Sequence, residues 1–338
     1  MRVPDRALAL LVAVPFVVGF TAAPADAGAE VAFTFADPEI VESSGLATLD
    51  GLVATVNDSG DSGRVFAVDP ASGETVGVTR WSPEPRDVEA VAPAGPGEVW
   101  VGDIGDNRGV RESVEVLRVP VRRGDRTVEP ERFELVYPDG ATDAETLMTE
   151  PGSGRLVVVS KGIFGGVVYR APARLDPDEP NRLEEVGTAI GLATDGAFFP
   201  DGRHLVVRNY GRAAVLTWPR LEEVGSFDLP DQDQGEGLAV DEDGQLLVGT
   251  EGAFSEVLRV SLPGEFQAAM AATPSPSAET SPLPADTVEP DDGYDGPGDG
   301  SDPQWGWLVA GLLVIVLPLL GVALLVLVVV SAVRGRRR

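Results

Sequence analysis

The chain has 338 residues and a formal net charge of −28, from 54 acidic and 26 basic residues. This charge repels nucleic acid, so a nucleic-acid partner is excluded. The sequence contains no cysteine and one histidine, His204, which we interpret as a turn residue in a hairpin. Disulfides and thiol nucleophiles are therefore excluded, and a Ser-His-Asp triad or a His-rich zinc site is not supported.

The first 27 residues have the pattern of a signal peptide. Arg2 and Arg6 precede an apolar run that ends near Ala23, and the small residues Ala25 and Ala27 follow. The run is shorter than the ~20 residues that cross a bilayer, and small residues at this spacing are accepted by signal peptidase. We therefore predict that residues 1–27 are a signal peptide. An N-terminal membrane anchor is the alternative.

Residues 28–263 contain a five-fold repeat of short β-type segments. Each repeat opens on a segment of small residues, passes through a Gly- or Asp-containing turn and continues into apolar runs. The openings are 45, 56, 50 and 41 residues apart. Such spacing is typical of four-stranded propeller blades. We predict an all-β, five-bladed β-propeller, with a six-bladed ring or a β-sandwich as alternatives. The repeats open at Ser44, Glu89, Glu145, Asp195 and Glu236.

The last repeat lacks a fourth strand, because its third apolar run ends at Leu262. A spare segment of the fourth-strand type lies at residues 31–35, near the start of the exported chain. Pairing of this segment with the last repeat would close the ring and remove an exposed sheet edge. We predict this closure.

The C-terminal part divides into three segments. Residues 264–304 are rich in Pro, Ser, Thr and Gly and carry nine acidic and no basic residues, so we predict a disordered linker. Residues 305–333 carry no charge, and at ~1.5 Å per residue they exceed the ~30 Å hydrocarbon layer. The basic tail 334–338 indicates a cytoplasmic C-terminus. We predict a single-pass cell-membrane protein with an extracellular propeller. A wall-sorting signal is the alternative, although no LPxTG motif precedes the run.

In a propeller, the starts of the innermost strands and the loops between second and third strands lie on one face. Acids that open successive repeats therefore meet at one mouth. Two carboxylates ~6 Å apart repel by about 3 kcal/mol at an effective dielectric near 20, so the group needs protons, a counterion or a metal. Oxygen ligands without His or Cys favour Ca²⁺, ahead of Mg²⁺ or Mn²⁺. The predicted metal ligands are Glu89, Glu145, Asp195, Glu236 and, from an acidic Gly-rich loop, Asp103.

The loops of the same face supply further polar candidates. Lys161 is the only lysine of the chain, and it is placed to neutralise Glu145 or to attract a substrate anion. In an alternative interpretation, the acids accept backbone N–H bonds and hold the inter-blade loops. The predicted ligand-binding residues are Asn57, Asp58, Lys161, Asn209 and Glu251.

The segment Glu236-Gly237-Leu238-Ala239, with Glu89 and Glu145 in matching places, resembles the channel-lining acids of calcium-dependent propeller hydrolases. These include the gluconolactonase and regucalcin-like group and the phytase-like esterase propellers. The resemblance implies a divalent ion that polarises an ester, lactone or phosphate. The first repeat departs from it, because Ser44 stands where the other repeats have an acid.

Two functions follow from these patterns. The first is a cell-surface propeller that binds an envelope protein, a glycan or a small molecule at its acidic mouth, with a divalent cation. The alternative is a metal-dependent hydrolase of an ester, lactone or phosphoester, in which Glu236 or Glu145 acts as the base. The stalk and membrane anchor favour the first.

Overall fold

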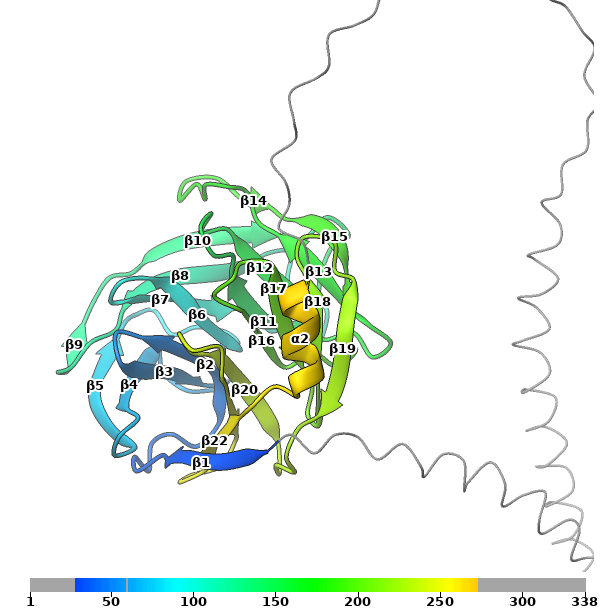
Figure 1. Cartoon of the computed structure of the whole chain (residues 1–338). Coiled ribbons are helices and arrows are strands. Elements are labelled where there is room, and N and C mark those ends of the chain that lie inside the picture. Colours follow the sequence, from blue (N-terminus) through cyan, green and yellow to red (C-terminus); the bar gives the residue numbers. More distant parts are fainter. Residues whose placement is uncertain (1–27, 59, 273–338) are drawn as a thin grey trace, which may run out of the picture. The chain divides into compact units, whose positions relative to one another are not determined.

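The structure is a computed structural model, and it describes residues 28–58 and 60–272. Five sheets, antiparallel except for one short outer strand in each of two of them, stand around a common axis, with their innermost strands side by side in a closed ring (Figure 1). The fold is a five-bladed β-propeller, as the repeat spacing predicts, and the described residues hold no sixth blade.

In blades 1 and 2, the chain adds strands in order from the innermost to the outermost. The outermost strand of each of these blades is short and parallel to its neighbour. Blade 1 comprises β2 (Ser43–Leu49), β3 (Leu52–Asn57), β4 (Arg64–Asp69), β5 (Glu74–Arg80) and β9 (Arg126–Thr127). Blade 2 comprises β6 (Ala90–Gly95), β7 (Glu98–Asp103), β8 (Val114–Pro120), β10 (Glu131–Val136) and β14 (Asn181–Arg182).

Blades 3, 4 and 5 have four strands each. Blade 3 comprises β11 (Ala144–Thr149), β12 (Leu156–Ser160), β13 (Gly166–Arg170) and β15 (Glu184–Ala189). Blade 4 comprises β16 (Asp195–Phe198), β17 (His204–Arg208), β18 (Arg212–Thr217) and β19 (Glu223–Asp228). Blade 5 comprises β20 (Gly235–Val240), β21 (Leu246–Thr250), β22 (Glu256–Val260) and β1 (Ala29–Thr34).

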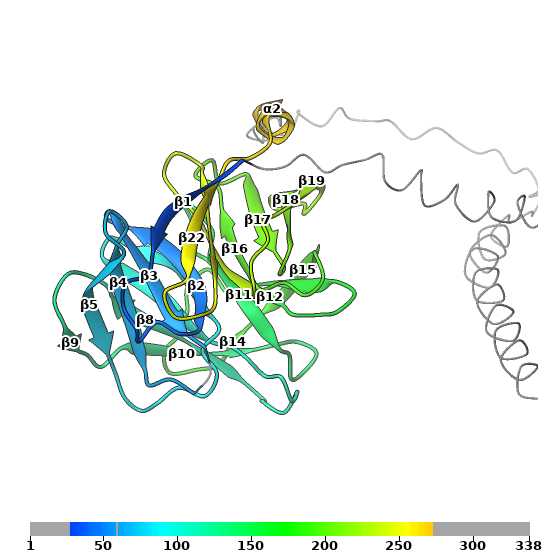
Figure 2. The ribbon, with the colours of Figure 1, turned by 90° about the horizontal axis from the view of Figure 1, so that it is seen from below.

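The ring closes through β1, which pairs antiparallel with β22 and so completes blade 5 with the first strand of the folded chain (Figure 2). The predicted closure by residues 31–35 is confirmed. Phe33 and Phe35 make an edge-to-face pair with ring centroids 5.4 Å apart and pack in the cluster between blades 5 and 1. The closing strand therefore contributes hydrophobic burial as well as backbone pairing.

The hydrophobic core is divided among the five blade interfaces. Each of the five clusters of buried side chains joins two neighbouring blades. Every residue of β3 and of β12 is buried, because neighbouring blades cover both faces of these sheets. This is why their sequences are continuous apolar runs with little polar alternation.

The innermost strands β2 and β20 are irregular near the end where they begin. The register of β2 shifts between Ser43 and Leu46, and that of β20 shifts between Gly235 and Leu238. A Cβ atom on Gly237 would lie 2.7 Å from Cγ of Leu46, so glycine is required for the two strands to approach here. The backbone N–H groups of Leu46 and Leu238, at the ends of these irregular stretches, donate to the carboxylate of Asp195.

A helix, α2 (Gly264–Ala272), follows blade 5, and Phe266 packs on Phe227 with ring centroids 5.6 Å apart. The prediction that a disordered linker begins at residue 264 is therefore wrong for these nine residues. The composition of the longer segment hid Phe266, which covers Gly225 of blade 4. The described residues contain no helix long and apolar enough to cross a membrane. The predicted signal peptide, the rest of the linker, the 305–333 span and the basic tail lie outside them.

His204 lies just after the turn in which we expected it. It is the first residue of β17, and its buried ring has Nδ1 2.6 Å from Oδ2 of Asp201.

Removal of a buried side chain from β1 tests how much this strand stabilises the ring. In the full chain, Phe33→Ala should lower the free energy of unfolding by about 3 kcal/mol or more, because a buried aromatic side chain is lost. Val31→Ala is the matched control, since Val31 is on the same strand but 52% exposed. Urea unfolding measures both. Equal losses in the two variants would show that β1 does not stabilise the ring through its buried face.

Candidate functional site

The candidate site is the face on which the innermost strands begin. The loops between the second and third strands of each blade end on the same face, so residues distant in sequence meet there. We call the carboxylates gathered here the acidic mouth. Its members are Asp58, Asp87, Glu89, Glu145, Glu236 and Glu251.

The tightest part of the acidic mouth is a carboxylate cluster formed by Asp58, Asp87 and Glu89, in which one oxygen of each residue lies within 4.8 Å of the others. Asp58 follows β3, and the two other residues precede β6, so blades 1 and 2 both contribute. Three converging carboxylates are a donor set suited to a hard divalent cation.

Gly105 makes room for the carboxylate cluster. A Cβ atom at this position would lie 2.5 Å from Oδ2 of Asp87 and 2.6 Å from Oε1 of Glu89. Any larger residue would therefore push the two carboxylates out of their positions. The backbone N–H of Gly105 also donates to the carbonyl oxygen of Asp87, at 3.2 Å.

Asp103 holds the carboxylate cluster in place from behind. Its carboxylate accepts the backbone N–H groups of Arg86 and Asp87, at 2.8 and 3.1 Å, and pairs with Nη1 of Arg111 at 2.8 Å. Both members of the ion pair are buried. The sequence predicts Asp103 as a metal ligand, but the structure assigns it to positioning Asp87.

Ser44 connects two acids of the acidic mouth. Its hydroxyl lies 3.4 Å from Oε2 of Glu89, 3.3 Å from Oε2 of Glu236 and 3.0 Å from the carbonyl oxygen of Glu89. Because Ser44 stands where the other repeats have an acid, the acidic mouth has one negative charge fewer at this position. Burial, together with the charges of Asp58, Glu145, Asp87 and Glu236, raises the pKa of Glu89 to about 10.

Glu145 forms an ion pair with Lys161, as the sequence suggested. Lys161 also lies over the ring of Tyr210, with Nζ 5.3 Å from the centroid. Burial raises the pKa of Glu145 to about 8, although Lys161 opposes this shift. Burial lowers the pKa of Lys161, but the Glu145 carboxylate outweighs it, and the net shift is upward. The second oxygen of Glu145, Oε2, is buried without a hydrogen-bond partner in the described part of the chain.

Glu251 and Glu236 share a neighbour in Gln234, whose Nε2 donates to Oε1 of Glu251 at 2.8 Å and to Oε1 of Glu236 at 3.1 Å. Burial raises the pKa of Glu251 to about 7, and the charges of Glu236, Asp58 and Glu42 act in the same direction. Glu251 therefore changes its protonation state near neutral pH.

Asp195 is fully buried and takes no part in the carboxylate cluster. Its Oδ2 accepts the N–H groups of Leu238 and Leu46, at 2.6 and 3.4 Å, which joins blade 4 to blades 5 and 1. Arg208 joins blades 4 and 5 by donating from Nη1 to the carbonyl oxygens of Gly237 and Gly249. The sequence predicts Asp195 as a metal ligand. The structure instead shows the alternative role, an acid that holds backbone N–H groups.

Two of the predicted ligand-binding residues also serve the backbone. Oδ1 of Asn57 accepts from the N–H groups of Val41 and Glu42, and its Nδ2 donates to the carbonyl oxygen of Glu39. Asn209 accepts from Gly211 and Arg212 with Oδ1 and donates to Gly191 with Nδ2. These amides fix the loops of the acidic mouth.

Asp87 is not among the predicted site residues, because it neither opens a repeat nor lies in a loop between second and third strands. A signal was present two positions before each repeat opens, where four of the five repeats have an acid or an amide. These residues are Glu42, Asp87, Asp143 and Gln234. Asp143 also positions a loop, since its Oδ1 accepts the N–H of Asp106 at 2.8 Å.

No protein-family model matches the chain, and no curated protein matches its sequence. Among solved structures, the chain is similar to glutaminyl cyclase from Myxococcus xanthus, with 14% identity and a TM-score of 0.46 over 71% of this chain and 98% of that one. It is also similar to a glucose dehydrogenase, with 11% identity and a TM-score of 0.42 over 70% of this chain and 100% of that one. At this level of similarity, neither activity is transferred to the chain.

The buried state of Glu89 predicts a dependence of stability on pH. Its folded pKa lies above its unfolded value of 4.5, so the folded protein keeps a proton that the unfolded chain loses. Without divalent cations, stability contributed by Glu89 therefore falls as pH rises from about 5 to 10, by up to about 1.4 kcal/mol per pH unit.

Glu89→Gln should reduce this fall, because glutamine stays neutral at every pH. Glu131→Gln, at an exposed position of β10, is the matched control. Urea unfolding at pH 5, 7 and 9 in EDTA gives the slopes. A Glu89→Gln slope equal to that of the wild type would contradict the assignment.

Proposed function

We propose that the protein is a binding propeller that holds a divalent cation, preferentially Ca²⁺, at its acidic mouth and recognises its ligand on the same face. The observation that carries this proposal is the convergence of Asp58, Asp87 and Glu89 to within 4.8 Å.

The electrostatics of the acidic mouth support a cation. Glu89 is 2% exposed and retains a proton in the absence of metal, because burial and its acidic neighbours disfavour the carboxylate. A divalent cation would take the place of that proton and offset the repulsion between the acids. All donors are oxygens, which suits Ca²⁺ best.

The distribution of exposed apolar side chains supports ligand recognition on this face. Of the exposed large hydrophobic residues in the described part of the chain, all except Val31 lie in loops on the face of the acidic mouth. We call this set the apolar rim: Val41, Val110, Ile163, Phe164 and Phe254. Exposed apolar side chains that gather on one face of a protein often mark an interaction site. An envelope protein, a glycan or a small molecule is the proposed ligand class.

The proposed location follows from the sequence. Export by residues 1–27 and anchoring by residues 305–333 would hold the propeller outside the cell membrane, with the tail in the cytoplasm. The acidic mouth would then meet extracellular Ca²⁺.

One observation favours hydrolysis as a second candidate function. The pKa values of Glu145 and Glu251, about 8 and about 7, are close to the pH at which a general base operates. A cation in the carboxylate cluster could polarise an ester, lactone or phosphoester, and Lys161 would attract an anionic group.

Cation binding is tested by thermal unfolding of the full chain in EDTA and then in Ca²⁺. At a hundredfold excess over the dissociation constant, Ca²⁺ should stabilise the wild type by about 2.7 kcal/mol. Asp87→Asn should lose most of this gain, whereas Asp139→Asn, at an exposed turn position, should keep it. No stabilisation of the wild type by Ca²⁺, Mg²⁺ or Mn²⁺ would refute the proposed cation site.

The two candidate functions are separated by turnover assays. If the protein only binds its ligand, p-nitrophenyl acetate, p-nitrophenyl phosphate and glucono-δ-lactone should react at the buffer rate in the presence of Ca²⁺. Turnover that is lost in Glu145→Gln or Glu236→Gln and retained in Glu131→Gln would establish the hydrolase instead. The expected result is no turnover above buffer.

A further inference from the structure

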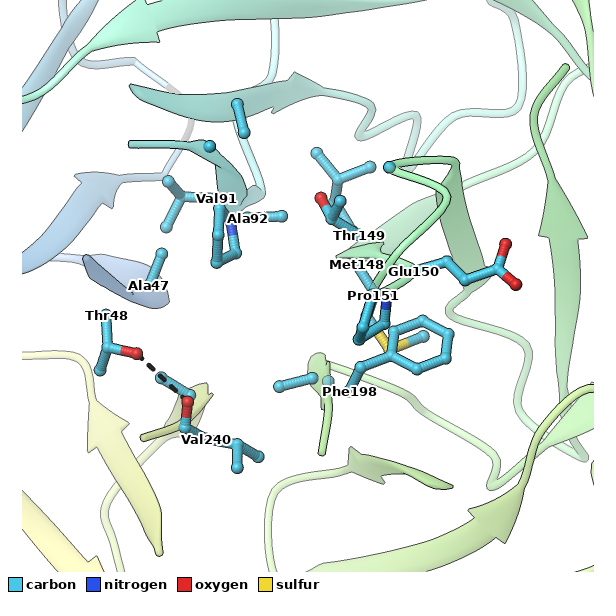
Figure 3. Close-up of a pocket in the computed structure, with 18 of the residues that line it drawn as sticks. Ala47, Thr48, Val91, Ala92, Met148, Thr149, Glu150, Pro151, Phe198 and Val240 are labelled. Atoms are coloured by element: carbon cyan, nitrogen blue, oxygen red, sulfur yellow. Dashed lines mark hydrogen bonds between the residues drawn. The ribbon is translucent and has the colours of Figure 1, made fainter. Parts of the chain in front are cut away.

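The opposite end of the central channel holds a second cavity, of about 500 Å³. It is lined by the later halves of all five innermost strands and by the turn that follows β11 (Figure 3). None of the residues of the acidic mouth lines it. Residues 46–48, 91–95, 147–154, 196–198, 239 and 240 form the wall.

Hydrogen bonds between neighbouring innermost strands separate the cavity from the acidic mouth. Asp195 joins β16 to the N–H groups of Leu46 and Leu238, and Ser44 joins β2 to Glu89 and Glu236. Asp195, Ser44, Glu89 and Glu236 precede the cavity wall in the chain, and Leu46 is the first wall residue of β2. The two ends of the channel therefore have different chemistry.

The wall of the cavity carries no uncompensated charge. Glu150 is the only ionisable residue in it, and its carboxylate accepts from Nε1 of Trp218 at 2.9 Å, Nη2 of Arg170 at 2.6 Å and Oγ of Ser153 at 2.7 Å. Figure 3 shows this carboxylate turned away from the centre of the cavity. The wall offers no unpaired side-chain charge to a charged ligand, so the cavity favours a neutral one.

Most of the wall is apolar, and its polar groups are few. Val91, Ala92, Met148 and Val240 surround the opening in Figure 3. The hydroxyl of Thr48 donates to the carbonyl oxygen of Val240, at 3.2 Å. Oγ1 of Thr149 is buried without a hydrogen-bond partner in the described part of the chain. The inner edges of the strands can also offer backbone N–H and C=O groups to a ligand.

We propose that this cavity binds a small neutral molecule with an apolar body and at least one hydrogen-bonding group. Its volume lies within the ~300–1,000 Å³ of typical ligand pockets, which combine apolar walls with a few polar groups. The backbone N–H and C=O groups at the inner edges of the strands would meet the polar group of the ligand. This site is independent of the cation at the acidic mouth.

The test is photolabelling of the full chain in lipid nanodiscs with a neutral aromatic probe, trifluoromethyl-diazirinyl benzyl alcohol. Mass spectrometry of the peptides identifies the labelled positions, so probe dissolved in lipid does not confuse the result. We expect saturable labelling in the segments around residues 91–95 and 147–154. Thr149→Trp should fill the cavity and reduce this labelling at least tenfold. Thr127→Trp, at an exposed position of β9, should not.

Ala197→Leu is a second variant that fills the cavity with a smaller side chain, and it keeps the test valid if Thr149→Trp misfolds. Circular dichroism shows whether each variant is folded. Labelling should persist in Asp87→Asn, so failure of the cation site and failure of this cavity are distinguishable. Absence of saturable labelling in the wild type would overturn the proposal. A segment of the chain that fills the cavity itself would give this result. Unchanged labelling in both folded filling variants would overturn it as well.

Discussion

The closure of the ring is the constraint on which the other features depend. Each blade has two apolar faces, and both are covered only when every blade has two neighbours. The pairing of β1 with β22 provides the last contact, and it joins the first strand of the described residues to the last. Once the ring is closed, the innermost strands must converge on the axis. The residues at the starts of these strands are therefore held close to one another.

This convergence brings acids together against their mutual repulsion, and the structure relieves each one differently. Asp195 gives its oxygens to backbone N–H groups, Glu145 has Lys161, and Glu236 has Ser44 and Gln234. Glu89 lies against Asp58 and Asp87, and burial together with these neighbours raises its pKa. The same repeat position has thus acquired several roles, and among the described residues the carboxylate cluster is the place where we propose a cation.

The two ends of the channel differ in their chemistry, and we propose a different kind of ligand for each. At the acidic mouth, loops bring charged side chains and the apolar rim to a surface. At the other end, small and apolar residues of the innermost strands leave a neutral cavity. The ties made by Asp195 and Ser44 lie between them, so a substitution at one end need not disturb the other.

The sequence by itself determined the number of blades, the closing strand and the face that collects the acids, because turns and apolar runs are local patterns that recur at a fixed spacing. It also indicated the partnership of Lys161 with Glu145. Which acids converge was decided by the tertiary structure. Asp87 enters the cluster because Asp103, which pairs with Arg111, accepts its backbone N–H and because Gly105 leaves room for its side chain. Asp195 instead accepts the N–H groups of Leu46 and Leu238, in strands of irregular register. Such roles depend on contacts between residues far apart in the chain, and no repeat pattern records them. Helix α2 was missed for the same reason, since only the packing of Phe266 on blade 4 distinguishes it from the segment that follows.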